Sequence, residues 1–286
     1  MTEHWQHPVS NPILTTVWTE TLLARDHQKP TAMGTRFRYS NAMNCSRRLV
    51  FDALGVRESD PIDPAGIHVT TIGTWIHEQM QAAVAAKYPG ATFEVKSSIK
   101  DLVSGSADGV IDVASVIVTW NGGKISWEIK SIGGFGFKKA IGMAGRGYKR
   151  GMPEGPRIGA IAQCALNAKG NDCDTCIVSY ISLEAVSKQA AQVVGLSEFD
   201  RFTAEWHIPR EVWEPLADAE IARLDYLDDY YVSSNPGKAF PHGDAYEDGE
   251  WRQISPNDAR RHWSCEYCPH LNTCLAVEDG ALDLPL

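Results

Sequence analysis

Gly105-Ser106-Ala107-Asp108-Gly109 and Trp127-Glu128-Ile129-Lys130 are the two segments that decide how the fold of this chain is interpreted. Their alternation of apolar and polar residues predicts two strands. Because a strand repeats every two residues, Glu128 and Lys130 share one face, about 7 Å apart along the chain. A carboxylate placed there can hold a hard divalent cation. The ammonium beside it can orient an attacking water or stabilise charge on a phosphate.

The Glu-x-Lys pattern also occurs in Glu94-Val95-Lys96, so context must separate the two copies. Only Glu128 follows, by 20 residues, an acid set between glycines on a strand. Such glycines indicate a bend or the close approach of a ligand to the backbone. Asp112 lies on the same face of the same predicted strand as Asp108 and competes with it as a ligand. The flanking glycines favour Asp108.

Two polar residues on predicted helices have no distinctive signal of their own. His77 shares a helix face with Met80 and Val84, and such a histidine is most often a satisfied core residue. Gln163 follows the glycine-rich segment and is by itself an ordinary polar residue.

The composition bounds the class of protein. The chain has 286 residues and a mass of 31.5 kDa, with 43% hydrophobic and 22% charged residues. These values are typical of a globular protein and exclude global disorder or a fibrous repeat. No apolar run approaches the roughly 18 residues of a membrane span, and the first residues lack the pattern of a signal peptide. We therefore expect a cytoplasmic protein with no membrane partner.

Periodicity and turn residues predict an α/β core with helical additions. We expect four segments: an irregular arm over 1–39, a helical segment over 40–70, a core over 71–210, and a helix with a cysteine-rich segment over 211–286. The expected elements are helices at 40–53, 71–88, 158–169 and 211–231, and strands at 92–100, 103–113, 116–131 with a hairpin at 121–123, and 175–183. Nine glycines in 133–159 argue against a helix or central strand there.

Charge is distributed unevenly along the chain. The net charge is −9, which argues against coating nucleic acid through the overall field. Between residues 124 and 157, however, lie only two acids and eight basic residues: Lys124, Lys130, Lys138, Lys139, Arg146, Lys149, Arg150 and Arg157. This window is either a positive groove or a solvated charged loop. As a groove, it would act as a mobile flap whose Phe135, Phe137 and Tyr148 offer stacking faces. The P-loop pattern is absent, which argues against nucleotide hydrolysis.

Seven cysteines without a secretory signal are better interpreted as ligands or buried thiols than as disulfides. Cys265, Cys268 and Cys274 lie close together in a segment with too few apolar residues for its own core, which suggests a metal centre. A fourth ligand could be Cys45. Alternatively, Cys173 and Cys176 could complete a zinc site with Cys265 and Cys268. The spacing of the cysteines favours zinc and iron–sulfur equally. Cys164 is predicted to be a small core residue.

Taken together, these motifs resemble the iron–sulfur RecB-type nucleases of the PD-(D/E)xK superfamily. The chain is most similar to the CRISPR-associated Cas-four exonucleases and their stand-alone, often phage-borne relatives. The resemblance runs from Ser40 to Cys274. It rests on these motifs, in order along the chain: Cys45-Ser46-Arg47-Arg48, Gly73-Thr74-Trp75-Ile76-His77-Glu78, Gly105-Ser106-Ala107-Asp108-Gly109, Trp127-Glu128-Ile129-Lys130, Ala162-Gln163-Cys164-Ala165-Leu166, and the triplet Cys265, Cys268, Cys274.

The resemblance implies a restriction-endonuclease-like core, a central mixed sheet flanked by helices, with a [4Fe–4S] cluster joining the N- and C-terminal segments. It implies that His77, Asp108, Glu128 and the Ile129 carbonyl bind Mg²⁺ or Mn²⁺, and that Lys130 and Gln163 complete the catalytic set. Iron–sulfur then ranks ahead of zinc, with Cys45, Cys265, Cys268 and Cys274 as ligands. Expected DNA contacts are Lys138, Lys139, Arg146, Tyr148, Lys149 and Arg150.

The activity implied by the resemblance is hydrolysis of single-stranded DNA ends with 5′→3′ polarity, in the cytoplasm of a cell or of a phage-infected host. Two features depart from the family pattern. Asn167 replaces a tyrosine of the glutamine motif, and the chain is unusually acidic. The alternative is a non-catalytic module, stabilised by iron–sulfur or zinc, that binds DNA or a partner. That alternative predicts loss of metal ligands, whereas His77, Asp108 and Glu128 are all present.

Overall fold

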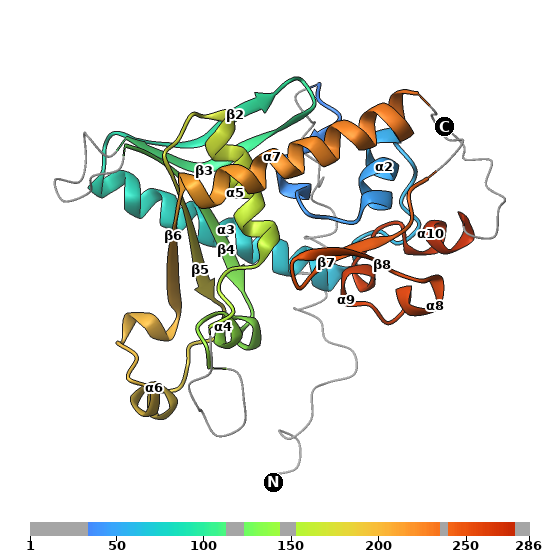
Figure 1. The fold of residues 1–286 in the computed structure, drawn as a ribbon. Coiled ribbons are helices and arrows are strands. Elements are labelled where there is room, and N and C mark those ends of the chain that lie inside the picture. Colours follow the sequence, from blue (N-terminus) through green and yellow to red (C-terminus); the bar gives the residue numbers. More distant parts are fainter. Residues whose placement is uncertain (1–33, 113–122, 144–152, 235–239, 278–286) are drawn as a thin grey trace, which may run out of the picture.

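The chain forms an α/β structure with a central six-stranded mixed sheet flanked by helices (Figure 1). In this computed structural model the described residues are 34–112, 123–143, 153–234 and 240–277. The strand order is β1-β3-β4-β5-β6, with β2 also paired to β3. Pairing is antiparallel for β2–β3, β3–β4 and β5–β6, and parallel for β1–β3 and β4–β5. The strands of this sheet are β1 (Phe37–Arg38), β2 (Ala91–Ile99), β3 (Val103–Asp112), β4 (Lys124–Ile132), β5 (Thr175–Ser182) and β6 (Thr203–Pro209).

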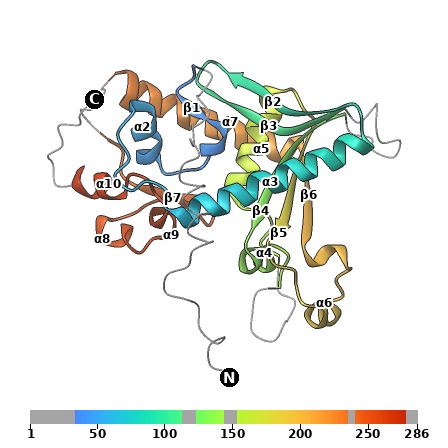
Figure 2. The same ribbon diagram turned by 180° about the vertical axis from the view of Figure 1, so that it is seen from behind.

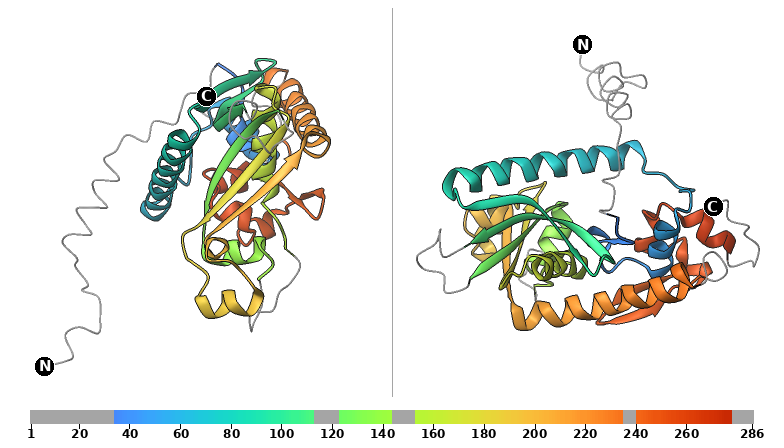
Figure 3. Two further views of the ribbon diagram at one scale, coloured as in Figure 1. Left: turned by 90° about the vertical axis from the view of Figure 1, so that its left-hand side faces the viewer. Right: turned by 90° about the horizontal axis from the view of Figure 1, so that it is seen from above.

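Helices cover both faces of the sheet. Figure 3 shows α3 on one side and α5 and α7 on the other, and in Figure 2, the view from the back of the molecule, α3 runs in front of the sheet. The helices are α2 (Ser46–Leu54), α3 (Pro64–Lys87), α4 (Gly134–Ala140), α5 (Ile158–Gly170), α6 (Lys188–Val194), α7 (Arg210–Leu227), α8 (Pro256–Ala259), α9 (Trp263–Glu266) and α10 (Leu271–Val277). Short 3₁₀ turns lie at Tyr39–Asn41 and Phe199–Arg201, and a π-helical turn, Asp228–Ser233, follows α7. None of the described helices combines the length and apolar character that crossing a membrane requires.

Alternation along β4 divides the core into two parts. Ile125, Trp127 and Ile129 pack with residues of α3 in the smaller cluster. On the opposite face, Ser126 meets the backbone of α5, and Lys130 donates to Gln163 of the same helix. The predicted sharing of one strand face by Glu128 and Lys130 is therefore confirmed, and this face is the one that α5 covers.

Several predicted boundaries are corrected by the structure. Helix α3 begins at Pro64 rather than near 71, because Asp63 caps it by accepting from the Gly66 amide at 2.7 Å. The expected segment boundary at 70/71 therefore falls inside this helix. Helix α2 begins at Ser46, whereas Ser40 lies in the preceding 3₁₀ turn. The predicted hairpin at 121–123 involves residues outside the described ranges, as does the predicted irregular arm over 1–39 up to residue 33. The rest of that arm is not irregular, because it contains β1 and the start of the 3₁₀ turn.

The glycine-rich segment contains a helix that the glycine count had argued against. Helix α4 places Phe137 in the main core with no exposed surface. Its glycines permit close packing: a Cβ at Gly134 would meet the Glu184 carboxylate, and one at Gly136 would lie 3.0 Å from the Ile132 side chain. Burial of Phe137 also corrects its prediction as a stacking face of a flap. Packing against neighbours therefore outweighs the low helix propensity of glycine here.

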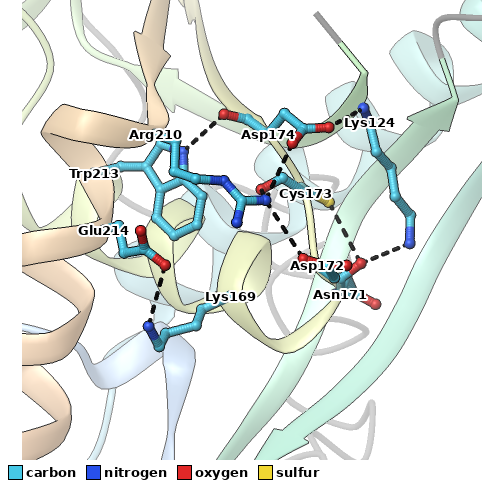
Figure 4. A network of polar contacts seen from close by, with 9 residues as sticks. All are labelled: Lys124, Lys169, Asn171, Asp172, Cys173, Asp174, Arg210, Trp213 and Glu214. Atoms are coloured by element: carbon cyan, nitrogen blue, oxygen red, sulfur yellow. Dashed lines mark hydrogen bonds and ion pairs between the residues drawn. The ribbon is translucent and has the colours of Figure 1, made fainter.

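A polar network fixes the start of β4, the α5–β5 turn and the start of α7 (Figure 4). The amide of Lys124 donates to Asp174 Oδ2 at 2.8 Å, and its ammonium donates to the Asn171 carbonyl at 2.6 Å. Arg210 of α7 donates to the Cys173 carbonyl and to Asp174 Oδ1 at 2.8 and 3.1 Å. Cys173 is thus a buried part of the turn.

The N- and C-terminal segments are joined by polar contacts at both ends of α2, and we call this arrangement the clasp. Ser46, at the start of α2, donates from its hydroxyl to Asp244 at 2.6 Å, 198 residues later in the chain. At the other end of α2, Asp52 lies 3.0 Å from the buried ring of His270. After α7, the C-terminal segment contains the hairpin β7 (Asp244–Glu247) and β8 (Glu250–Gln253) and three short helices.

The glycines beside Asp108 have a packing role. A Cβ at Gly105 would lie 2.6 Å from the ring of Tyr39, and one at Gly109 would lie 3.0 Å from Trp127. The predicted reason for these glycines, close approach of a ligand, is therefore replaced by close approach of aromatic side chains.

Gly105→Ala should lower the free energy of unfolding by about 1–3 kcal/mol, because Tyr39 is fully buried and cannot move aside easily. Urea denaturation measures the change. Gly133→Ala is the matched control, since a Cβ there meets nothing within 4 Å. Equal stability of the two variants would contradict the packing role.

Candidate active site at the end of β4

The site lies where β3 separates from β4. Antiparallel pairing of these strands ends at Gly109 opposite Trp127. Beyond that pair, β3 offers no backbone acceptor to the Ile129 amide. The Asp108 side chain accepts this hydrogen bond instead, through its Oδ2 at 2.6 Å. The side chain is nearly buried, with 8% of the residue exposed. Asp108 is thus fixed at the fork of the two strands, with its other oxygen still able to bind.

Helix α3 brings His77 to that second oxygen. The Nδ1 atom of His77 lies 3.4 Å from Asp108 Oδ1. One turn further on, Gln81 donates to the Asp108 carbonyl at 2.9 Å, so the helix is anchored to β3 at two points. Burial acts most strongly on the His77 pKa and lowers it, but the hydrogen bond and charge of Asp108, with the charge of Glu128, outweigh burial and raise the pKa.

Glu128 and Lys130 form a buried ion pair. Glu128 has no exposed surface, and the Lys130 ammonium lies 2.6 Å from its Oε1. Burial raises the Glu128 pKa to about 7, the charge of Asp108 adds to this, and Lys130 opposes it. Burial also acts most strongly on the Lys130 pKa, lowering it, but the adjacent carboxylate outweighs burial and raises the pKa. Gln163 Oε1 accepts from Lys130 Nζ at 2.9 Å and fixes the direction of the ammonium.

The five predicted catalytic residues are therefore brought together, while the acids of the competing patterns, Asp112 and Glu94, are not among them. Asp112 is exposed at the far end of β3. Glu94 is exposed on β2 and accepts from Gln81 and Ser106. Within the described ranges, however, no three His, Cys, Asp or Glu side chains form a group placed to hold a metal ion. The Lys130 ammonium already neutralises one oxygen of Glu128.

A cavity of about 1010 Å³ extends from Lys130 to the clasped terminal segments. The four cysteines predicted as cluster ligands line it together: Cys45, Cys265, Cys268 and Cys274. All are free thiols, as are the other three cysteines. Arg47 donates to Cys274 Sγ at 3.3 Å, and the Asp244 amide donates to Cys45 Sγ at 3.4 Å. Burial raises the Cys45 pKa to about 12.

The remaining cysteines do not belong to this cavity. Cys173 and Cys176 have no exposed surface and lie in the main core beside α5 and β5. The predicted alternative, a zinc site shared by this pair with Cys265 and Cys268, is therefore not the arrangement in the structure. Cys164 is fully buried and packed near Ser126, which confirms its prediction as a core residue.

The predicted DNA contacts are only partly described. Lys138 and Lys139 lie on α4, 4.0 Å from Glu184 and 3.6 Å from Glu154, respectively. Arg146, Tyr148, Lys149 and Arg150 fall outside the described residues.

Sequence reasoning missed two residues at the site. Gln81 follows His77 by one helical turn, a spacing that could have singled it out. Arg157 precedes α5, lines the cavity beside Lys130, and has no ion-pair partner within the part of the chain that the structure describes. Its place in the basic window was visible, but its direction depends on the Arg157 amide donating to the buried Tyr180 hydroxyl at 2.7 Å.

Comparison with known proteins leaves the family unassigned. No family model and no curated protein matches the chain. Chains of solved structures do match, among them one titled "Crystal structure of SSO0001". It is 17% identical, the match covers 92% of this chain and 96% of that chain, and the TM-score is 0.47. The grounds for a function therefore lie in the site itself.

Glu128 should make the metal-free protein sensitive to pH. Its pKa is about 7 in the folded chain against an ordinary 4.5, so the folded state binds this proton more tightly than the unfolded state. The resulting stability is present below pH 4.5 and is lost as the pH rises toward 7.

Glu128→Gln removes this titration. When the pH is raised from about 5 to about 8, the free energy of unfolding of the variant should therefore increase by roughly 2–3 kcal/mol relative to that of wild type. Urea unfolding at both pH values in metal-free buffer measures the gain. Glu94→Gln, an exposed counterpart, should show none. A difference between Glu128→Gln and wild type that does not change with pH would contradict the raised pKa.

Proposed function

We propose that this chain is a metal-dependent DNA exonuclease with a PD-(D/E)xK-type core. The observation that carries the proposal is the convergence of His77, Asp108, Glu128, Lys130 and Gln163 on the fork between β3 and β4. These residues come from two helices and two strands, and the ion pair at their centre is buried. A merely structural role would not explain why a carboxylate, an ammonium and an imidazole gather there at the cost of desolvation.

The donor atoms suit a hard divalent cation. Both carboxylate oxygens of Glu128 are buried without a well-aligned hydrogen-bond donor, the nearest charge being the Lys130 ammonium. Asp108, Glu128, His77 and the Ile129 carbonyl would hold Mg²⁺ or Mn²⁺, and the imidazole favours Mn²⁺. A bound ion supplies an acidified water and charge neutralisation at the scissile phosphate. Lys130, directed by Gln163, would orient that water and stabilise the developing negative charge.

The four cavity cysteines support a [4Fe–4S] cluster as the second part of the proposal. They come from both ends of the chain yet line one cavity, and two of them already accept N–H···S hydrogen bonds. Such hydrogen bonds stabilise thiolate ligands and tune iron–sulfur clusters. A cluster here would reinforce the clasp between the terminal segments. Zinc in the same four-cysteine set is the narrower alternative.

The family resemblance supplies the remaining detail of the proposal. It favours single-stranded DNA ends as substrate, with 5′→3′ polarity, and the cytoplasm, including that of a phage-infected host, as the location. A non-catalytic binding module is the competing outcome and is tested together with the activity.

Asp108→Asn and Lys130→Ala should each lower the rate of release of labelled nucleotides from single-stranded DNA, in Mn²⁺, by about 10²–10⁴-fold. The matched controls are Asp112→Asn on the same strand and Lys96→Ala in the second Glu-x-Lys copy, which should retain activity. End-labelled substrates distinguish the polarity. An inert wild type that still binds DNA would instead support the non-catalytic module.

The purified protein should be brown, absorb light at about 400 nm and contain about four iron atoms per chain. Cys274→Ser should lower the iron content sharply, because one of four ligands is lost. Cys173→Ala should not, because Cys173 lies in the α5–β5 turn rather than in the cavity. Zinc without iron in the wild type would overturn the assignment of the metal.

A further inference from the structure

Three large aromatic side chains are unusually exposed on the walls of one cavity. Phe135 of α4 is 73% exposed, Trp263 of α9 is 62% exposed and Tyr267, just after α9, is 82% exposed. All three line the cavity that also reaches Lys130. Figure 1 and Figure 2 show that α4 extends from the end of β4 whereas α9 belongs to the C-terminal segment. Aromatic rings from two distant parts of the chain therefore border the same space.

The neighbours of these rings are mostly basic. The cavity lining includes two acids, Glu154 and Asp244, against five cations: Arg47, Arg48, Lys130, Lys139 and Arg157. Three of these cations already have ion-pair partners: Lys130 with Glu128, Lys139 with Glu154 and Arg48 with Asp52. The lining still contrasts with the whole chain, whose net charge is −9. The Lys139 ammonium lies 5.5 Å from the centre of the Phe135 ring, so one wall offers an aromatic face and a positive charge together.

We infer that Phe135, Trp263 and Tyr267 stack on unpaired bases and lead a single strand of nucleic acid through this cavity toward Lys130. The inference rests on the proposed nuclease function and adds a binding role for the C-terminal segment. Alternating aromatic faces and cations are what single strands require, since bases stack on the rings while phosphates meet the charges. An apolar peptide would not account for the cations, and a second copy of this acidic chain offers no unpaired bases for the rings to stack on.

The size of the cavity favours one strand over two. Its volume, about 1010 Å³, lies at the upper end of the range for sites that hold small organic ligands. The proposed cluster would occupy the part of this space between the four cysteines, so only the remainder is open to a substrate. A short stretch of one strand fits that remainder, whereas the body of a duplex does not. In a duplex, moreover, the flat faces of the bases are stacked on each other and unavailable to the rings. The aromatic residues would thus confer a preference for unpaired ends.

Binding can be measured separately from cleavage. Fluorescence anisotropy, without added divalent metal, gives the Kd of the full-length protein for a labelled oligothymidylate and for an abasic strand of equal length. Trp263→Ala, Tyr267→Ala and Phe135→Ala should each raise the Kd for oligothymidylate by roughly tenfold, within a range of about 5- to 150-fold, and leave the Kd for the abasic strand unchanged. Trp263→Phe keeps a stacking face and should restore most of the affinity.

Trp75→Ala provides the matched control. Trp75 is 60% exposed on α3 and does not line the cavity, so its removal should change neither Kd. Arg157→Gln should weaken binding of both strands equally, because a phosphate contact does not depend on the base. Thermal unfolding of every variant tests for loss of structure, and Trp263→Leu, which removes the aromatic face but keeps an apolar side chain, replaces Trp263→Ala if the latter unfolds.

The outcomes separate the inference from the function on which it rests. Wild-type preference for oligothymidylate over the abasic strand, with no loss in the three variants, would overturn the stacking role and leave the nuclease proposal intact. An equal loss of affinity for both strands in those variants would indicate that the three rings support the fold instead. A wild type that binds neither strand would remove both proposals. Self-association of the wild type that the three variants abolish would assign the surface to a second copy of the chain.

Discussion

The buried ion pair between Glu128 and Lys130 is the interaction on which the rest of the site depends. Isolated charges on a central strand would be too costly to bury, so the two side chains must meet each other and find further polar partners. Gln163 supplies one partner on α5, and the fork beside Asp108 supplies the nearby negative charge. The positions of α5 and β3 are therefore tied to the chemistry of β4 as well as to packing. A cation bound at this point would complete the neutralisation that Lys130 only begins.

A single cavity connects this ion pair with the terminal segments. Lys130 stands at one part of its lining, and Cys45 and Cys274 at another. The N–H···S contacts and the clasp of α2 show that the cysteine-rich segment is docked on the core by polar contacts of its own. Structural support and substrate access would therefore share one wall in the proposed nuclease. Arg157, next to Lys130, illustrates the overlap, since its backbone positions Tyr180 while its side chain lines the cavity.

Sequence alone could predict most strands but only part of the site. Alternation located β2, β3 and β5 to within one or two residues, and it placed Glu128 and Lys130 on one face. Periodicity treated His77 as a core residue, and only the family resemblance singled it out, because the contact with Asp108 joins elements 31 residues apart. Helix α4 was missed because burial of Phe137 depends on tertiary packing. Strand β6 was missed as well, and it lies at the edge of the sheet.

The clasp between α2 and the end of the chain also bears on how the protein is made. Ser46 and Asp52 leave the ribosome early, but their partners Asp244 and His270 are synthesised about 200 residues later. The sheet and α5 can assemble during translation, as segments generally do from the N-terminus onward. Helix α2 must wait, with its polar groups facing solvent, until the segment that carries Asp244 and His270 has been made. Nascent chains that stop short of this segment would carry a formed sheet and an open cavity wall, so its synthesis commits the molecule to its finished shape.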